Sequence, residues 1–107
     1  MAFPQQVNID EQGNLAPGTV TLYTAPSGYN AIIQGITFTS AAANVLTVIV
    51  NKLNPISSVT SYAFTLAAGD VVCDNTVYYL KTGESISVTT TAASTDYMFR
   101  GLANFTY

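Results

Sequence analysis

The chain has 107 residues, the size of one domain, with 8% charged residues and a net charge of −3. It has no histidine and one cysteine, which excludes Ser-His-Asp and Cys-His catalysis, an internal disulfide and a Cys-only metal cluster. Three basic residues cannot neutralise a run of phosphates, so we expect no nucleic-acid partner.

The N-terminus, residues 1–6, has neither a basic start nor a long apolar segment, so it does not resemble a secretory signal. No stretch approaches the roughly 20 apolar residues that span a bilayer. We therefore expect no membrane partner and synthesis in a cytoplasm.

Residues 1–18 differ in composition from the rest of the chain, because their few apolar residues lie among Gln, Asn, Gly and Pro. Val7 and Ile9 alternate with polar residues, and the segment ends at the turn-forming Ala16-Pro17-Gly18. We interpret residues 1–18 as an extended N-terminal arm, with a disordered terminus as the alternative, and residues 19–107 as the domain. Such an arm can add to an open sheet edge of a neighbouring subunit. Deleting it through Leu15 is then expected to weaken association and leave the β-fold intact.

The remaining sequence favours short strands. The expected strands are Val20–Thr24, Ala31–Ser40, Val45–Val50, a strand containing Tyr62, Phe64 and Leu66, Val71–Cys73, Val77–Leu80, Ser85–Thr91 and Tyr97–Leu102. Residues 104–107 are either a last strand or the end of the chain after it. Seven to nine short strands with no helix predict an all-β fold: a single antiparallel β-sandwich or jelly-roll-like barrel with an extended N-terminal arm.

Two details of strand facing follow from the alternation of side chains. In the second strand, Ile32, Ile36 and Phe38 are expected on one face and Ile33 on the other. Residues 45–50 are apolar at nearly every position, which is typical of a strand covered on both faces.

The acidic residues follow turns. Leu66-Ala67-Ala68-Gly69-Asp70 and Leu80-Lys81-Thr82-Gly83-Glu84 share the form Leu-x-x-Gly-acid, which predicts equivalent turns with both carboxylates in solvent. Asp70 and Asp74 are the best candidates for a catalytic pair, but solvated acids cannot hold the proton of a general acid. We therefore expect no enzyme activity, no metal and no cofactor. Cys73, in an apolar run, is expected to be buried.

Low charge and abundant apolar strand residues indicate a subunit covered by partners, because a free monomer usually charges its surface and its sheet edges. We expect a homo-oligomer, with a trimer favoured. The candidate interface residues lie in the arm and the aromatic C-terminal segment: Phe3, Val7, Ile9, Leu15, Tyr97, Phe99, Arg100, Phe105 and Tyr107. The seven tyrosines offer an alternative, a sugar-binding groove.

Three stretches, residues 21–33, 66–70 and 80–88, carry a resemblance. Leu22-Tyr23-Thr24-Ala25-Pro26-Ser27-Gly28 followed by an apolar strand, and the later Leu-x-x-Gly-acid pair, resemble small bacteriophage virion proteins of the capsid decoration or cement type. That resemblance covers most of residues 19–90 and implies a β-sandwich located in the virion, made in the host cytoplasm, that contacts the major capsid protein or another virion protein. A tail, neck or fibre component and a receptor- or glycan-binding module remain alternatives.

Overall fold

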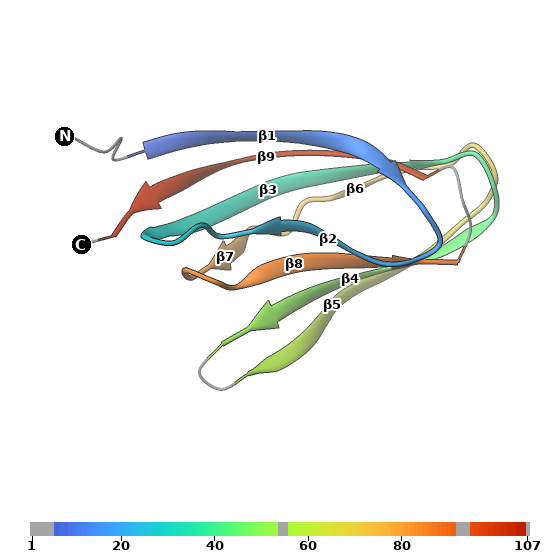
Figure 1. The fold of residues 1–107 in the computed structure, drawn as a ribbon. Helices are drawn as coiled ribbons and strands as arrows, with labels where there is room; N and C mark the ends of the chain where they lie inside the picture. The colour runs from blue at the N-terminus through green and yellow to red at the C-terminus, as the bar shows by residue number, and fades with distance from the viewer. Residues whose placement is uncertain (1–5, 54–55, 92–94, 107) are drawn as a thin grey trace.

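Nine strands make up the computed structural model, which describes residues 6–53, 56–91 and 95–106 (Figure 1). The strands are β1 (Gln6–Leu15), β2 (Gly18–Thr24), β3 (Tyr29–Ser40), β4 (Asn44–Lys52), β5 (Ser57–Leu66), β6 (Val71–Asp74), β7 (Tyr78–Leu80), β8 (Ser85–Thr90) and β9 (Thr95–Phe105). Those three ranges contain no helix, and so none long and apolar enough to cross a membrane.

The strands form two antiparallel sheets. The five-stranded sheet has the order β1-β9-β3-β6, with β7 also paired to β3, and the four-stranded sheet has the order β2-β8-β4-β5. In Figure 1 the first sheet lies above the second, and the apolar inner faces of both sheets enclose the core. The predicted β-sandwich is confirmed.

The segment expected to be a separate arm is part of the sandwich. Residues 6–15 are extended, but they pair with β9 of the same chain over their whole length, from Gln6 opposite Asn104 to Leu15 opposite Thr95. Ile9 and Leu15 are buried in the core. Residues 1–5 of the predicted arm lie outside the described residues. The physical reason for the correction is that β1 supplies inner-face side chains that the core needs.

A β-bulge changes the facing of β3. Its pairing with β9 shifts between Gln34 and Thr37, and Gly35 between them has a φ of 64°, which glycine adopts without a Cβ clash. Because one extra residue reverses the alternation, Ile33 joins Ile36 on the buried face, and Ile32 lies on the partly exposed face. The expected grouping of Ile32 with Ile36 was wrong for this reason.

Only one face of β4 is covered by this chain. Leu46, Val48 and Val50 are buried, whereas Val45 is exposed, so the expectation of two covered faces does not hold within the single chain. The outer face of the same sheet is rich in hydroxyl groups. Thr19 Oγ1 lies 2.8 Å from Thr89 Oγ1, and Thr21 Oγ1 lies 3.3 Å from Ser87 Oγ.

The two Leu-x-x-Gly-acid segments form equivalent turns, as predicted. Gly69 and Gly83 have φ angles of 84° and 85°. The amide of Ala67 donates to Asp70 Oδ2 at 2.8 Å, and the amide of Lys81 donates to Glu84 Oε1 at 2.9 Å. Asp70 is exposed, as expected, but Glu84 is buried. The difference arises because the carboxylate of Glu84 also accepts a hydrogen bond from the amide of Leu53, which follows β4.

Candidate functional site

The predicted interface residues fall into three groups. Ile9, Leu15 and Phe99 are buried in the chain's own core and are not available to a partner while β1 and β9 are paired. Val7 and Arg100 are exposed, and Tyr97 and Phe105 are partly buried. Phe3 and Tyr107 lie outside the described residues. The C-terminal aromatics mainly pack internally, since the ring of Tyr97 stacks on Phe99 with centroids 6.1 Å apart.

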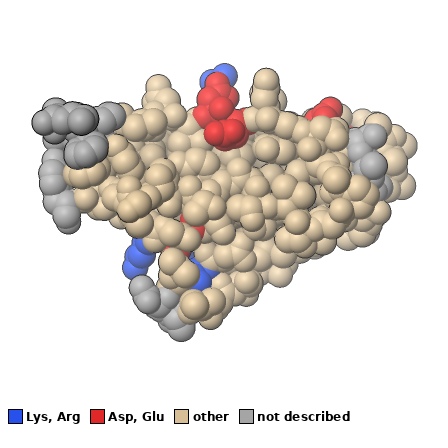
Figure 2. Space-filling model, viewed as in Figure 1, with Lys and Arg blue, Asp and Glu red and all other residues tan. Residues whose placement is uncertain are grey.

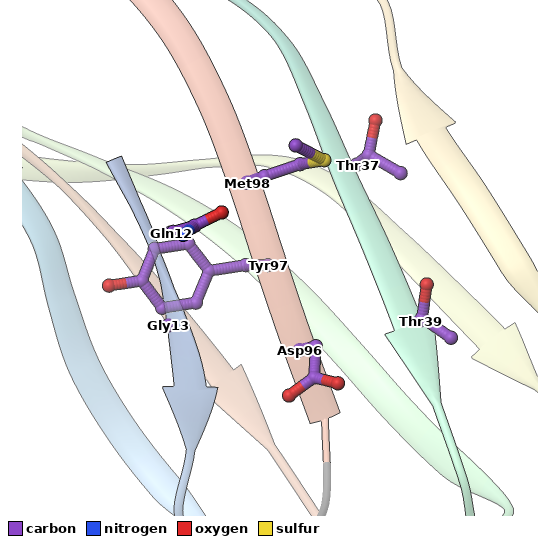
Figure 3. Close-up of a pocket in the computed structure, with 7 residues that line it drawn as sticks. All are labelled: Gln12, Gly13, Thr37, Thr39, Asp96, Tyr97 and Met98. Atoms are coloured by element: carbon purple, nitrogen blue, oxygen red, sulfur yellow. The ribbon is translucent and has the colours of Figure 1, made fainter. Parts of the chain in front are cut away.

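A shallow depression of about 450 Å³ lies on the outer face of the five-stranded sheet. Figure 3 shows its lining from three strands: Gln12 and Gly13 of β1, Asp96, Tyr97 and Met98 of β9, and Thr37 and Thr39 of β3. Asp96 is its one carboxylate, and Oδ1 of that residue accepts a 2.8 Å hydrogen bond from Asn14. With a single, already engaged carboxylate, this depression offers no acid–base pair.

Asp74 is buried, which corrects the expectation that it is solvated. Its Oδ1 accepts a hydrogen bond from the amide of Thr76 at 3.0 Å, and its Oδ2 accepts one from the hydroxyl of Tyr78. The same hydroxyl is hydrogen-bonded to Ser61 Oγ at 2.9 Å. Burial and the bond to Asp74 raise the pKa of Tyr78 to about 12. Both oxygens of Asp74 therefore serve the fold.

Glu84 is likewise engaged on both oxygens. Its Oε1 accepts the amide of Lys81, and its Oε2 accepts the amide of Leu53 at 3.0 Å. The hydrogen bond from the Lys81 amide is the main reason that the pKa of Glu84 lies below its ordinary value, and the Leu53 amide adds to the effect. Within the described residues, no group of three or more His, Cys, Asp or Glu side chains is placed to hold a metal ion.

Exposed large hydrophobic side chains are concentrated in the part of the chain that forms β5, β6 and β7. Ten large hydrophobic side chains are exposed in the described residues, and six of them lie between residues 56 and 79: Ile56, Val59, Tyr62, Val71, Val77 and Tyr79. We call these six residues the β5–β7 flank. Val71 and Tyr79 are 66% and 69% exposed, and Val59 and Tyr62 are about half exposed at 47% and 49%. Of these, Val59 and Tyr62 lie in the same row of β5, and neighbouring exposed apolar side chains mark an interaction surface better than scattered single residues do.

The β5–β7 flank also has very little charge. Residues 56–80 contain only Asp70 and Asp74 as charged residues, and Asp74 is buried. The opposite side carries Asp10 and Glu11 on β1. In Figure 2 acidic atoms gather over β1, while the lower right of the view is uncharged and basic atoms lie at the lower left, toward the end of β4 that carries Lys52. Interfaces are depleted of charge at their centres, so the flank has the composition of a contact surface.

A groove of about 350 Å³ lies within this side of the molecule, lined by Tyr62, Phe64, Cys73, Asp74, Asn75 and Thr76. The rings of Tyr62 and Phe64 stack with centroids 5.5 Å apart. Cys73 is exposed, which corrects the expected burial, and its Sγ donates to Asn75 Oδ1 at 3.3 Å. The reason is strand parity, because Val72 and Asp74 take the inner positions of β6 and Cys73 the outer one.

Sequence reasoning placed the candidate interface residues at the chain ends and did not single out the exposed β5–β7 flank. The usable signal was the run from residue 56 to residue 80, in which two acids are the only charges. The strand expected around Tyr62, Phe64 and Leu66 consists of uncharged residues. It therefore lacks the charged side chains that usually prevent an edge strand from pairing with another chain.

No protein-family model matches the sequence, and no curated protein matches it. Among solved structures, one similar chain is described by the words "Bacillus endospore appendages form a novel family of disulfide-linked pili". The match has a TM-score of 0.60 at 12% sequence identity and covers 94% of this chain and 86% of that chain. At this identity the likeness concerns the fold, and it agrees with the two-sheet sandwich described above.

Proposed function

We propose that this chain is a non-catalytic structural subunit that acts by associating with further copies of itself in a larger particle. The observation that carries the proposal is the β5–β7 flank, where six large hydrophobic side chains are exposed among residues with almost no charge. Covering apolar surface stabilises association by about 25 cal/mol per Å² of area removed from water. Few charges have to be desolvated when this flank is covered.

The finer form of the proposal is a bacteriophage virion protein of the capsid decoration or cement type. The turn and strand pattern of residues 21–33, 66–70 and 80–88 supports it through its resemblance to such proteins. In this form the chain is a trimer that contacts the major capsid protein or another virion protein, and it is located in the virion. Tail, neck and fibre positions are variants of the same role.

A second candidate is a subunit of an extracellular filament. It is favoured by the fold shared with a chain described as belonging to disulfide-linked pili, together with the exposure of Cys73. Oxidation of two Cys73 thiols from different copies would form one S–S bond, with two protons and two electrons passing to an oxidant such as dioxygen. Because these 107 residues contain one cysteine, such bonds join copies only in pairs.

Size-exclusion chromatography with light scattering tests the shared core of both forms. The full chain at micromolar concentration is expected to give a multiple of its 11.3 kDa mass. A monomer of 11.3 kDa over the whole accessible concentration range would overturn the proposal.

Electron microscopy and a non-reducing gel separate the finer forms. A virion decoration protein is expected to form closed oligomers and to be found on the surface of the parent particle. A filament subunit is expected to form extended polymers, with a dimer band on the non-reducing gel that Cys73→Ser removes. Binding to a glycan array without either kind of assembly would instead favour a glycan-binding module.

A further inference from the structure

The sandwich has four sides at which a strand has a free edge, and they differ in protection. Unpaired edges invite pairing with another chain, and natural proteins block them with charges, bulges or short strands. At one side β1 carries Asp10 and Glu11. On the other side of the same sheet, β6 and β7 have four and three residues.

The two edges of the four-stranded sheet are β2 and β5. β2 has seven residues and a register shift between Thr21 and Tyr23. All of β2 lies in the described part of the chain, and it exposes no large hydrophobic side chain. β5 has ten residues and contains no charged residue, glycine or proline. The pairing of β5 with β4 also shifts register beside Ser61. Among the edge strands that contain no charged residue, β5 is nevertheless the longest.

The core-facing side chains of β5 are only partly covered, because β5 is the last strand of its sheet. Tyr62 lies opposite Val48, and Val59 lies opposite Val50, both on the face that encloses the core. Val48 and Val50 are buried, whereas Tyr62 and Val59 remain about half exposed. An additional strand beside β5 would cover these two side chains and pair the free backbone groups of the edge in one step.

We propose that β5 is the association edge of this chain and that its occupant is β5 of a second copy, paired antiparallel about a two-fold axis. This inference rests on the proposed function in its shared form, self-association. Because a two-fold contact joins copies in pairs, it names a dimer contact and does not by itself build the trimer of the virion form. The pairing joins two four-stranded sheets into one sheet of eight strands. Val59 and Tyr62 of each copy then line the underside of the joined sheet and cover the same row of the other copy.

Three properties of the surface select a second β5 over other occupants. A free strand edge needs another extended backbone, which a second copy supplies. β5 exposes an apolar row, and only another β5–β7 flank offers a matching one, because β2 exposes no large hydrophobic side chain in the part of the chain described. β1 would place Glu11, which shares the inner face of its strand with Ile9 and Leu15, against that apolar row and leave its carboxylate poorly solvated.

Matched lysine substitutions at the two edges of one sheet test the inference. Thr60→Lys places a charge on β5, and Thr24→Lys places the same charge on the exposed part of β2. A two-fold contact contains each substitution twice, so Thr60→Lys is expected to weaken self-association by at least about tenfold through like-charge repulsion. Thr24→Lys is expected to leave the association constant unchanged. Circular dichroism and thermal unfolding check that both variants fold, and Ala63→Lys replaces Thr60→Lys if that variant does not.

The outcomes separate this inference from the proposed function. Loss of association in the β5 variant alone supports the two-fold contact. Normal assembly by the folded β5 variants overturns the β5 inference and leaves the proposed function standing. Equal loss of self-association in both variants indicates that β5 of one copy pairs with β2 of the next in an open chain of copies. That outcome overturns the two-fold contact. A wild-type chain that remains monomeric overturns both proposals.

Discussion

The hydroxyl of Tyr78 donates a hydrogen bond to the carboxylate of Asp74 beneath the β5–β7 flank. Because the same hydroxyl is bonded to Ser61 Oγ, the pair joins β7 and the end of β6 to β5 of the opposite sheet. Asp74 is 2% exposed and Tyr78 is 5% exposed, so water cannot replace these partners easily. The network holds the two sheets together on the side where β5 has its free edge.

Tyr78→Phe is expected to lower the free energy of unfolding by about 1–3 kcal/mol, since it leaves the buried carboxylate of Asp74 and the partly buried hydroxyl of Ser61 without their partner. Tyr79→Phe, one residue away on the exposed face, is expected to change stability by less than about 0.5 kcal/mol. Urea unfolding curves of both variants measure the difference. Equal effects would show that the network contributes nothing particular to stability.

The Tyr78 hydroxyl also gives the stability a defined dependence on high pH. Burial and the bond to Asp74 raise the pKa of Tyr78 from 10.0 to about 12. Between these values the folded chain keeps the proton that the unfolded chain loses, so this contribution is complete below pH 10 and is lost as the pH rises toward 12. Unfolding curves from pH 9 to pH 12 should show a shallower decline for Tyr78→Phe than for the wild type.

Glu84→Gln is expected to destabilise the chain by about 1–3 kcal/mol, because an amide cannot accept from both the Lys81 and the Leu53 amides with its two terminal atoms. The pKa of Glu84 is lowered from 4.5 mainly by the Lys81 amide, so its contribution is present above that pH and is lost as the pH falls through the lower folded value. Thermal unfolding from pH 3 to pH 7 measures this. The exposed Glu11→Gln serves as the control, and the same loss in both variants would contradict the turn-closing role.

Gly101→Ala is expected to disrupt the pairing of β3 with β9. A Cβ at residue 101 would lie 2.0 Å from the carbonyl oxygen of Ile32, and a backbone atom within a sheet cannot move aside as a side chain can. The expected loss of stability is about 3 kcal/mol or more. At Gly13 a Cβ would meet the ring of Tyr97 at 3.0 Å, and the ring can shift, so Gly13→Ala is expected to be milder. Thermal unfolding distinguishes the two, and an equal effect would contradict the close-approach argument.

Leu15→Ala is expected to lower the free energy of unfolding by about 2–5 kcal/mol, since the side chain is 1% exposed in the core. Val7→Ala, on the same strand with 40% exposure, is expected to change it by less than about 1 kcal/mol. Urea unfolding measures both. Deleting residues 1–15 should therefore impair folding, contrary to the expectation for a separate arm. A deletion variant with unchanged stability would restore the arm interpretation.

The strand content and the turns were predictable because they depend on neighbouring residues. Alternation and Gly-acid turns are local signals, and the turn at Gly69 and the turn at Gly83 both form as expected. The facing of Ile33 was not predictable, because the bulge at Gly35 is defined by the register with β9. The burial of Glu84 depends on the distant amide of Leu53, which no local pattern indicates.

The sequence indicated that a contact surface exists but not which residues form it. The deficit of charge indicated a covered subunit, but Ile9 and Phe99 were assigned to an interface and lie in the core. Their burial follows from pairing between the two ends of the chain, where Gln6 lies opposite Asn104. Such distant pairing leaves no mark in the local sequence. The edge position of β5 likewise depends on strand order.

Hydrogen exchange of β5, read by mass spectrometry at two protein concentrations, tests the central claim most directly. At a dilution where the chain is monomeric, the outward amides of residues 57–66 have no partner strand among the described residues and should exchange quickly. At concentrations where the chain assembles, peptides from residues 57–66 should gain protection, while those from the acidic edge at residues 6–15 should not. Assembly without any gain of protection in residues 57–66 would contradict self-association through this edge.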